Sequence, residues 1–283
     1  MENITISSLS DFVSEIIKFY NNSRPDKHLF FRGHSQANWK LLPSVIRDKD
    51  KYKERDIYLD FMQYAPEHNI QYDFISQSDR VLADMQHYVT PTRLLDWTVN
   101  PLIALYFSCC DVNSTDKDGK VYLFDPWTYN SRINNYSKPK SHEANIYARS
   151  LLVYDWKDVE IQKHVREKYL LNYNVSLEKP FAYVSQFTNK RKVHQRGCFL
   201  IWGKNERPFE DIVRKIKCKK PILDCFTIKG SCKETILNEL NMFYINPYSI
   251  YPDYKGMSEM IKSHGGLFNL STLESSFAIE GSC

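Results

Sequence analysis

The sequence predicts an α+β fold in a single domain. Segments with helical periodicity are mixed along the chain with short, alternating, strand-like segments. Aromatic residues make up 14% of the 283 residues, which favours a compact protein that contains a sheet. No internal repeat, low-complexity tract or obvious linker divides the chain. A chain of this length can bury a full hydrophobic core.

The first expected helix begins near Ser8, and its apolar side chains recur at helical spacing: Phe12, Ile16 and Phe19. Residues 21–27 contain turn-forming residues and are expected to form a loop. Residues 28–33 follow as a short strand that ends at Gly33 and places Arg32 at its edge.

The middle of the chain predicts two helices, a strand and a third helix. Residues 50–64 form a charged, periodic helix whose expected apolar side is Tyr52, Ile57, Phe61 and Tyr64. A helix over 78–87 is stopped by Pro91, and residues 93–98 alternate as a strand. Thr98 or Asn100 caps the helix that starts at Pro101.

The second half of the chain predicts further strands. Residues 120–124 alternate as a strand that Pro126 ends, and residues 130–144 are polar and irregular, typical of a long exposed loop. Three more strands are expected at 181–184, 197–203 and 221–228, and a helix at 233–240.

Composition indicates a cytoplasmic protein with reduced thiols. No apolar run approaches the roughly 20 residues that span a bilayer, so no membrane partner is expected. The first residues lack the basic and apolar regions of a secretory signal. Seven cysteines without a Cys-x-x-Cys pair support neither a redox motif nor a metal site. The net charge of +4 is compatible with a polyanionic partner.

Three segments carry candidate chemistry. In Phe30-Phe31-Arg32-Gly33-His34, a strand-end arginine followed by glycine could aim its planar guanidinium into a cleft, where it suits phosphate or carboxylate. The same arginine could also be an ordinary surface residue. The second segment, residues 86–98, reads QHYVTPTRLLDWT and concentrates polar residues before an apolar helix.

Two interpretations of the second segment remain open. His87 could act as a base, as a donor or as a helix C-cap, and Asp96 could belong to a site or to an ion pair with its neighbours. The third segment is a basic loop before a strand, with Gln195 as the polar residue that could face a cleft. It suits an anionic ligand or a solvated surface, and its basic residues are Lys190, Arg191, Lys192, His194 and Arg196.

These motifs together resemble the FRG domain family. The resemblance begins at Phe31-Arg32-Gly33, continues through residues 86–98 and 104–107, and includes Gln195 with Gly197 and Phe199. It ends in the segment that starts at Tyr244, before the last helix, and spans residues 28–262. It implies three regions: an N-terminal helix and loop over 1–27, the FRG domain over 28–262, and a C-terminal tail over 263–283.

A second resemblance is to the ADP-ribosyltransferases whose signature is Arg, Ser-Thr-Ser, Glu. Arg32 is similar to the first-strand arginine, and residues 95–98 with the following helix resemble the Ser-Thr-Ser region. The third motif departs from the pattern, because Gly197 stands where the glutamate is expected two residues after Gln195. This resemblance implies a split β-sheet core with flanking helices and NAD as co-substrate.

The resemblance also implies roles for individual residues. Arg32, flanked by Phe31 and Gly33, would bind the NAD pyrophosphate, and Thr98 with Gln195 would position the nicotinamide ribose. Asp96 or His87 would be the general base, with Asp96 or a glutamate elsewhere as the missing carboxylate. The ring of Tyr88 or Trp97 would stack on nicotinamide or on an acceptor base.

The implied function is a toxin of a toxin–antitoxin or phage-defence system that transfers ADP-ribose to a nucleic acid, single-stranded RNA such as mRNA being favoured. The basic residues 190–196 would bind that acceptor, and an antitoxin or chaperone would be a protein partner. Three alternatives are a protein acceptor, a non-catalytic sensor of a nucleotide or phage component, and a metal-dependent nuclease built on Asp96 and His87.

Overall fold

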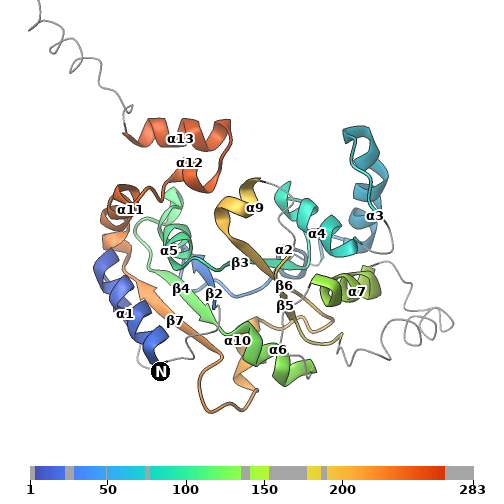
Figure 1. Ribbon diagram of the computed structural model, residues 1–283, viewed down its shortest axis with the longest axis horizontal. Coiled ribbons are helices and arrows are strands. Elements are labelled where there is room, and N and C mark those ends of the chain that lie inside the picture. The colour runs from blue at the N-terminus through green and yellow to red at the C-terminus, as the bar shows by residue number, and fades with distance from the viewer. Residues whose placement is uncertain are drawn as a thin grey trace, which may run out of the picture.

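A seven-stranded mixed sheet forms the centre of the molecule, in the strand order β1-β7-β4-β2-β3-β6-β5 (Figure 1). The computed structural model describes residues 4–22, 29–48, 50–73, 77–134, 141–152, 177–185 and 190–264. The predicted α+β class is confirmed. Of the expected C-terminal tail over 263–283, residues 263 and 264 end α13, and the rest lies outside the described residues.

Most strands lie where the alternating patterns predict them. Strand β1 pairs with β7 in parallel, and the other pairings of the sheet are antiparallel. The strand bounds are β1 Thr5–Ile6, β2 Phe30–His34, β3 Leu94–Thr98, β4 Gly119–Phe124, β5 Phe181–Tyr183, β6 Gly197–Ile201 and β7 Leu223–Ile228.

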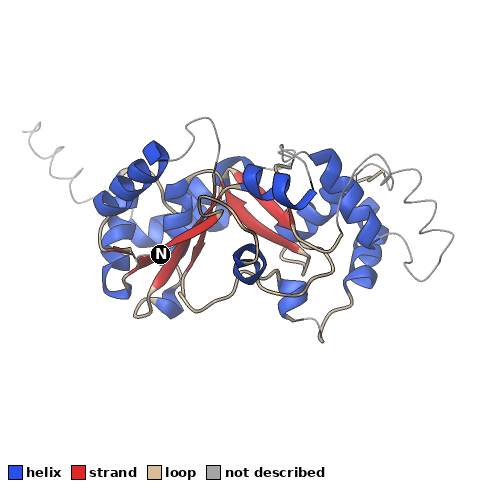
Figure 2. Ribbon diagram, turned by 90° about the horizontal axis from the view of Figure 1, so that it is seen from below, coloured by secondary structure: helices blue, strands red, loops and turns tan. Residues whose placement is uncertain are grey.

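Helices pack on both faces of the sheet (Figure 2). One face is covered by α1, α5 and α11 over β7, β4 and β2, and by α3, α4 and α7 over β3, β6 and β5. The α6 and α10 helices pack on the opposite face. The helix bounds are α1 Leu9–Asn22, α2 Ser44–Arg47, α3 Glu54–Tyr64, α4 Ser78–His87, α5 Pro101–Cys109, α6 Pro126–Asn134, α7 Ser141–Leu152, α9 Lys190–Gln195, α10 Phe209–Arg214, α11 Lys233–Met242, α12 Pro247–Ile250 and α13 Tyr254–His264.

The strands β2 and β3 share fewer paired residues than any other two neighbouring strands of the described sheet. One residue pair, Phe31 with Thr98, joins these two strands, whereas β2 pairs with β4 at five positions. Continued pairing would set Gly33 opposite Asp96, but no pair forms there among the described residues. The sheet is therefore continuous through a single pair, and β2 and β3 diverge beyond it. This divergence opens the space in which the candidate site lies.

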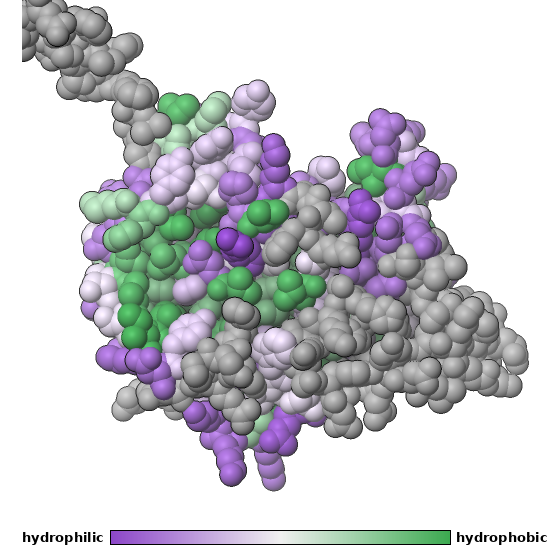
Figure 3. Space-filling model, in the orientation of Figure 1, coloured by the Kyte–Doolittle hydropathy of each residue, from purple (hydrophilic) through white to green (hydrophobic). Residues whose placement is uncertain are grey.

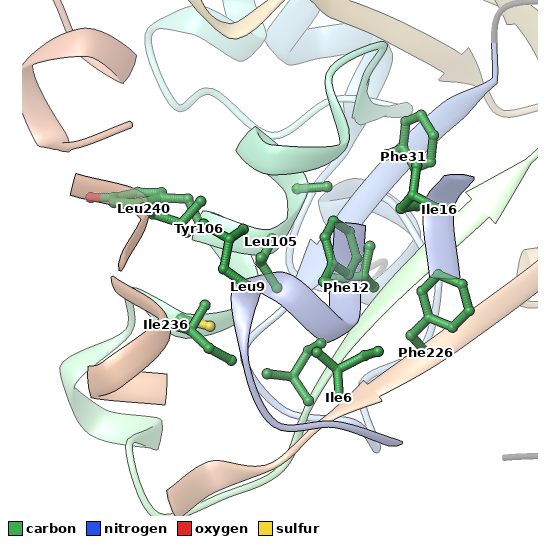
Figure 4. Packing of buried hydrophobic residues seen from close by; sticks show 14 of the residues in the cluster. Ile6, Leu9, Phe12, Ile16, Phe31, Leu105, Tyr106, Phe226, Ile236 and Leu240 are labelled. Carbon is green, nitrogen blue, oxygen red and sulfur yellow. The ribbon is translucent and has the colours of Figure 1, made fainter. Parts of the chain in front are cut away.

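The N-terminal segment is part of the core rather than an appendage. Ile6 of β1 and Leu9, Phe12 and Ile16 of α1 are buried, as the helical spacing predicts. Figure 4 shows them facing Phe31, Phe226 and the apolar side chains of α5 and α11. Burying side chains of this size stabilises the fold by about 1.5–3 kcal/mol each.

The predicted exposed loop over 130–144 is wrong at both of its ends, and its middle, residues 135–140, lies outside the described residues. Helix α6 runs from Pro126 to Asn134, α7 begins at Ser141, and Tyr129 and Asn130 are fully buried. The Asp125 side chain accepts hydrogen bonds from the Thr128 backbone N–H at 2.9 Å and from its hydroxyl at 2.6 Å. Pro126 therefore begins a capped helix, where its missing N–H costs little, in addition to ending a strand.

The apolar side of α3 matches the predicted one in part, because Ile57 and Phe61 pack against the core. Tyr58 is fully buried, whereas Tyr64, an expected core residue, is 61% exposed. In Figure 3, α3 at the upper right is mostly hydrophilic, and apolar residues gather on the left over α1, α5 and α11. The helix therefore contacts the molecule along a narrow line, because it lies beyond α4 rather than on the sheet.

No helix in the described ranges is long and apolar enough to cross a bilayer. The six cysteines within those ranges all carry free thiols. Burial raises the pKa of the Cys109 thiol to about 11 and that of Cys110 to about 12, so both stay protonated at neutral pH.

Candidate functional site

A pocket of about 470 Å³ lies where β2 and β3 diverge. Its volume falls within the range of small-molecule sites, roughly 300–1,000 Å³. It brings together side chains from the two diverging strands, from the end of α4, from α9 and from the α2 region. The polar residues that line it include Arg32, His34, Lys40, Arg47, Gln86, His87, Asp96, Thr98, Asp111, Arg191, Lys192 and Gln195.

Arg32 spans the gap between the two strands. Its Nε donates to His34 Nε2 at 2.9 Å, and its Nη1 donates to the backbone carbonyl of Asp96 on β3. The guanidinium thus satisfies a carbonyl that would bond to β2 if the ladder continued. Burial lowers the pKa of Arg32, and the positive charge of Arg47 acts in the same direction. An arginine keeps its charge under such a shift, so the pocket contains a partly desolvated cation.

His34 orients this arginine and stays neutral. It is 4% exposed and packs edge-on against the rings of Tyr122 and Trp39. Because Nε2 accepts from Arg32, the ring proton lies on Nδ1. Burial, with Arg32 as the next cause, lowers the pKa of His34 to about 3. His34 is therefore a fixed hydrogen-bond acceptor for Arg32 rather than a proton donor.

We expect His34 to make the fold sensitive to acid. Its folded pKa lies below the ordinary 6.5, so between about pH 6.5 and 3 the unfolded state binds the extra proton. The contribution of neutral His34 to the free energy of unfolding is therefore fully present above pH 6.5. It falls by about 1.4 kcal/mol per pH unit as the pH drops through that window. Urea unfolding at pH 7, 6, 5 and 4 measures the slope. The His34→Gln variant should show a shallower slope, and an unchanged slope would contradict this assignment.

A chain of hydrogen bonds positions Asp96. The Thr92 hydroxyl, which is fully buried, donates to Gln86 Oε1 at 2.6 Å, and this bond fixes which side of the amide faces Asp96. Gln86 Nε2 then donates to Asp96 Oδ2 at 2.7 Å. The Leu94 N–H donates to the Thr92 hydroxyl at 3.1 Å and completes the chain. The exposed carboxylate of Asp96 is therefore held in one orientation beside the Arg32 guanidinium.

Asp111 is the other carboxylate that lines the pocket, and it has a structural role. Its side chain accepts from the Ser114 hydroxyl at 2.6 Å and from the Asn113 N–H at 3.1 Å. These bonds lower the pKa of Asp111 and use its oxygens to cap a short 3₁₀ turn. Asp96 is consequently the better candidate for chemistry among the described carboxylates of the pocket.

His87 lies in the last turn of α4 and lines the same pocket. Burial lowers its pKa, and the positive charges of Arg191 and Lys192 lower it further. A neutral imidazole at physiological pH can accept a proton. Tyr88 packs edge-on against His87 with ring centroids 4.8 Å apart and is 62% exposed, so it stands beside the pocket rather than in its lining.

Arg93 does not pair with Asp96. Its Nε donates to both oxygens of Glu54, at 3.0 and 2.9 Å, and its Nη1 donates to the Trp202 carbonyl at 3.1 Å. Both partners of the ion pair are largely buried. Arg93 therefore forms its ion pair with Glu54 of α3 and not with Asp96, and the Asp96 side chain lines the pocket.

Thr98, Gln195 and Gly197 meet at the end of the pocket where β3 and β6 pair. The Thr98 hydroxyl donates to the Gln195 carbonyl at 2.7 Å and accepts from the Asn100 N–H at 3.0 Å. Its bonds therefore connect β3 to α9 and to the cap of α5. Gly197 pairs with Thr98, and a Cβ built on it would meet its nearest neighbour, the Lys192 carbonyl oxygen, at 3.8 Å. The position has room for a side chain, and this chain places none there.

Trp97 borders the pocket but is packed into the core. It is 3% exposed, and its ring packs against Phe124 at 5.3 Å and Phe209 at 6.2 Å. Alternation along β3 sends its side chain to the face opposite Asp96. Of the two aromatic residues expected to stack, Tyr88 is the accessible one.

The predicted basic loop is a short helix, α9, and its side chains divide among three environments. Lys190, His194 and Arg196 are exposed, whereas Lys192 is 6% exposed and lies 3.7 Å from Asp84. The Arg191 guanidinium stacks on Tyr251 at 4.6 Å. Burial lowers the pKa of Lys192. Lys192 therefore belongs to the pocket wall and not to an exposed nucleic-acid surface.

A larger cavity, about 930 Å³, lies between α1, α6 and β7. Its lining mixes apolar side chains such as Phe19 and Ile222 with scattered charges, and Asp125 in its wall caps α6. None of the sequence-predicted site residues lines it. The smaller pocket is therefore the candidate site. Within the described ranges, no three His, Cys, Asp or Glu side chains gather as metal ligands would.

Sequence reasoning named Arg32, His87, Asp96 and Gln195 but gave no role to Gln86, Thr92 or His34. The signal for His34 was its spacing of two residues from Arg32 on one strand, which puts both side chains on one face. The bond from Gln86 to Asp96 joins a helix end to a strand across a turn, and no local spacing rule predicts it.

Comparisons with known proteins identify one family. No curated protein and no solved structure matches the chain. The family model described as FRG domain matches residues 27–117. The later part of the predicted resemblance, residues 118–262, lies outside the matched range. The chain thus carries an FRG domain match over residues 27–117, which contains the β2, α4 and β3 side chains of the pocket.

Proposed function

We propose that this protein is an NAD-dependent ADP-ribosyltransferase whose site is the pocket between β2 and β3. One observation carries the proposal. A partly desolvated arginine, Arg32, and an oriented carboxylate, that of Asp96, line one pocket where the sheet is joined by a single residue pair. The guanidinium suits a pyrophosphate, and the carboxylate suits a ribose that develops positive charge.

The strand arrangement supports the proposal. The three motif-bearing strands β2, β3 and β6 are consecutive in the sheet, so Phe31, the neighbour of Arg32, pairs with Thr98, which pairs with Gly197. Because β2 and β3 are joined by one residue pair, the sheet is partly divided there, which is similar to the split sheet of the Arg, Ser-Thr-Ser, Glu enzymes. On this proposal NAD is a co-substrate, and its pyrophosphate lies at the mouth of the gap.

The proposed chemistry breaks the bond between ribose C1′ and the nicotinamide nitrogen. The bonding pair leaves with nicotinamide, and the ribose becomes oxocarbenium-like. Asp96 stabilises that charge from a fixed position, which avoids reorganisation during the reaction. The acceptor nucleophile forms the new bond to C1′, and its proton passes to neutral His87 or to Asp96. Asp96 thereby supplies the charge that a glutamate at position 197 would supply.

The acceptor we propose is a nucleic acid, with single-stranded RNA favoured. Lys190 and His194 are exposed on α9, Arg196 is exposed directly after it, and the accessible ring of Tyr88 lies beside His87. Cations that follow a phosphate backbone together with an aromatic ring suit an unpaired strand. We further propose that the protein acts as a toxin in a toxin–antitoxin or phage-defence system, restrained by an antitoxin or chaperone.

The test is to offer NAD labelled in its adenylate half to total RNA, DNA and protein, and to measure free nicotinamide in parallel. Label should enter RNA. Arg32→Gln should lower the cleavage rate at limiting NAD by roughly 10- to 100-fold, because a charge-assisted bond is worth about 1.5–3 kcal/mol. Normal cleavage by this variant would show that Arg32 does not bind NAD. If the label enters protein instead, the proposed transferase activity stands and the proposed acceptor is wrong.

A second candidate is a non-catalytic sensor that binds a nucleotide in the same pocket. The observation that favours it is Gly197, which offers no side chain where the related enzymes have their glutamate. Binding of NAD without release of nicotinamide would establish this candidate in place of the enzyme.

A further inference from the structure

Side chains from α2 and from the loop before it also line the pocket. They are Trp39, Lys40 and Arg47. The indole of Trp39 is 44% exposed and packs edge-on against His34 at 6.0 Å. His34 in turn accepts from Arg32 at 2.9 Å. One short line of contacts therefore connects an exposed ring to the central guanidinium.

Positive charge gathers in this part of the pocket, where Arg32, Lys40 and Arg47 all belong to the lining. Arg47 is near enough for its charge to disfavour protonation of both Arg32 and His34. Its own side chain is 60% exposed and only loosely paired, 3.9 Å from the Asp48 carboxylate. Lys40 is 64% exposed and lies 4.0 Å from Glu210. Two guanidinium groups that repel each other in one pocket are stabilised together by an anion between them, and a diphosphate offers one phosphate to each.

We infer that Trp39 and Arg47 form the subsite for the base and diphosphate of an adenine nucleotide, with Arg32 and Arg47 on the two phosphates and the indole stacked on the base. The inference rests on the proposed function for the identity of the nucleotide, the adenylate half of NAD. The two halves of NAD then lie on either side of Arg32, with the nicotinamide ribose toward Asp96 and the adenosine toward Trp39. An acceptor strand would occupy the α9 end.

Calorimetric binding of ADP, inorganic pyrophosphate and a uridine decanucleotide tests the subsite without any chemical step. Trp39→Ala should weaken ADP binding about tenfold and leave pyrophosphate binding unchanged, because base stacking alone is lost. Arg47→Gln should weaken both ligands about tenfold. Trp39→Phe should retain most of the ADP affinity. Arg214→Gln, which removes an exposed arginine outside the pocket lining, should change nothing.

The remaining outcomes separate this subsite from the proposed enzyme. Unchanged ADP binding in Trp39→Ala, or a loss confined to the uridine strand, would overturn the subsite, the second result assigning Trp39 to a nucleic acid. If ADP binding depends on Trp39 and Arg47 but NAD yields no nicotinamide, the subsite stands and the enzyme fails. If NAD is cleaved with a KM that neither variant changes, the enzyme stands and the subsite fails.

Discussion

Asp96→Asn should lower kcat for NAD cleavage by roughly 10²- to 10³-fold while NAD still binds. The substitution keeps the size of the side chain and keeps an oxygen that can accept from Gln86, but it removes the negative charge. A charge that acts on a developing cation contributes to the transition state far more than to the bound substrate. Release of nicotinamide at saturating NAD measures kcat, and binding of ADP-ribose measures the ground state.

Two other variants make this result specific. Asp111→Asn removes a carboxylate from the same pocket, and it should retain the cleavage rate because that side chain caps a 3₁₀ turn. Gln86→Ala leaves the charge of Asp96 but removes its hydrogen-bond donor, so kcat should fall by a smaller factor, about tenfold. Equal losses in Asp96→Asn and Asp111→Asn would show that the pocket responds to net charge and that Asp96 has no catalytic role.

The strands β2 and β3 and the helices α4 and α5 were predictable because each follows a local rule, whereas α2 and α9 were not predicted. Alternation marks residues 93–98 as a strand, and Asn100 before Pro101 marks the start of α5, where the Leu102 N–H donates to the Asn100 side chain at 2.9 Å. The motif around Arg32 shows a strand end. These rules concern neighbours in sequence, and they locate the polar residues without placing them relative to one another.

The connections between these elements were not predictable, since they depend on which strands become neighbours. Arg32 reaches Asp96 because β2 and β3 lie side by side and then diverge after one pair. The basic stretch illustrates the same limit. Whether Lys192 is exposed depends on how α9 packs against α4, where Asp84 lies close to its ammonium group. Charge in the sequence therefore predicted a surface, and packing assigned part of it to a pocket wall.

Gly33→Ala should destabilise the fold by about 3 kcal/mol or more, the upper part of the range for overpacked cores. A Cβ at this position would overlap the carbonyl oxygen of Ala104 and would lie 2.6 Å from the backbone nitrogen of Ser108. Both atoms belong to the backbone of α5, so no side-chain rotation can relieve the clash. Because Gly33 has no side chain, β2 lies directly against the backbone of α5. This close packing sets the position of Arg32 and His34 on either side of Gly33.

Gly197→Ala is the matched control, because it adds the same methyl group to another glycine of the pocket. Its nearest neighbour would be the Lys192 carbonyl oxygen at 3.8 Å, an ordinary contact, so stability should change by no more than about 0.5 kcal/mol. Urea unfolding of both variants measures the difference in free energy. If Gly33→Ala were as stable as Gly197→Ala, β2 and α5 would have to separate easily. The position of Arg32 would then depend on its bonds to His34 and Asp96 rather than on close packing of the strand against the helix.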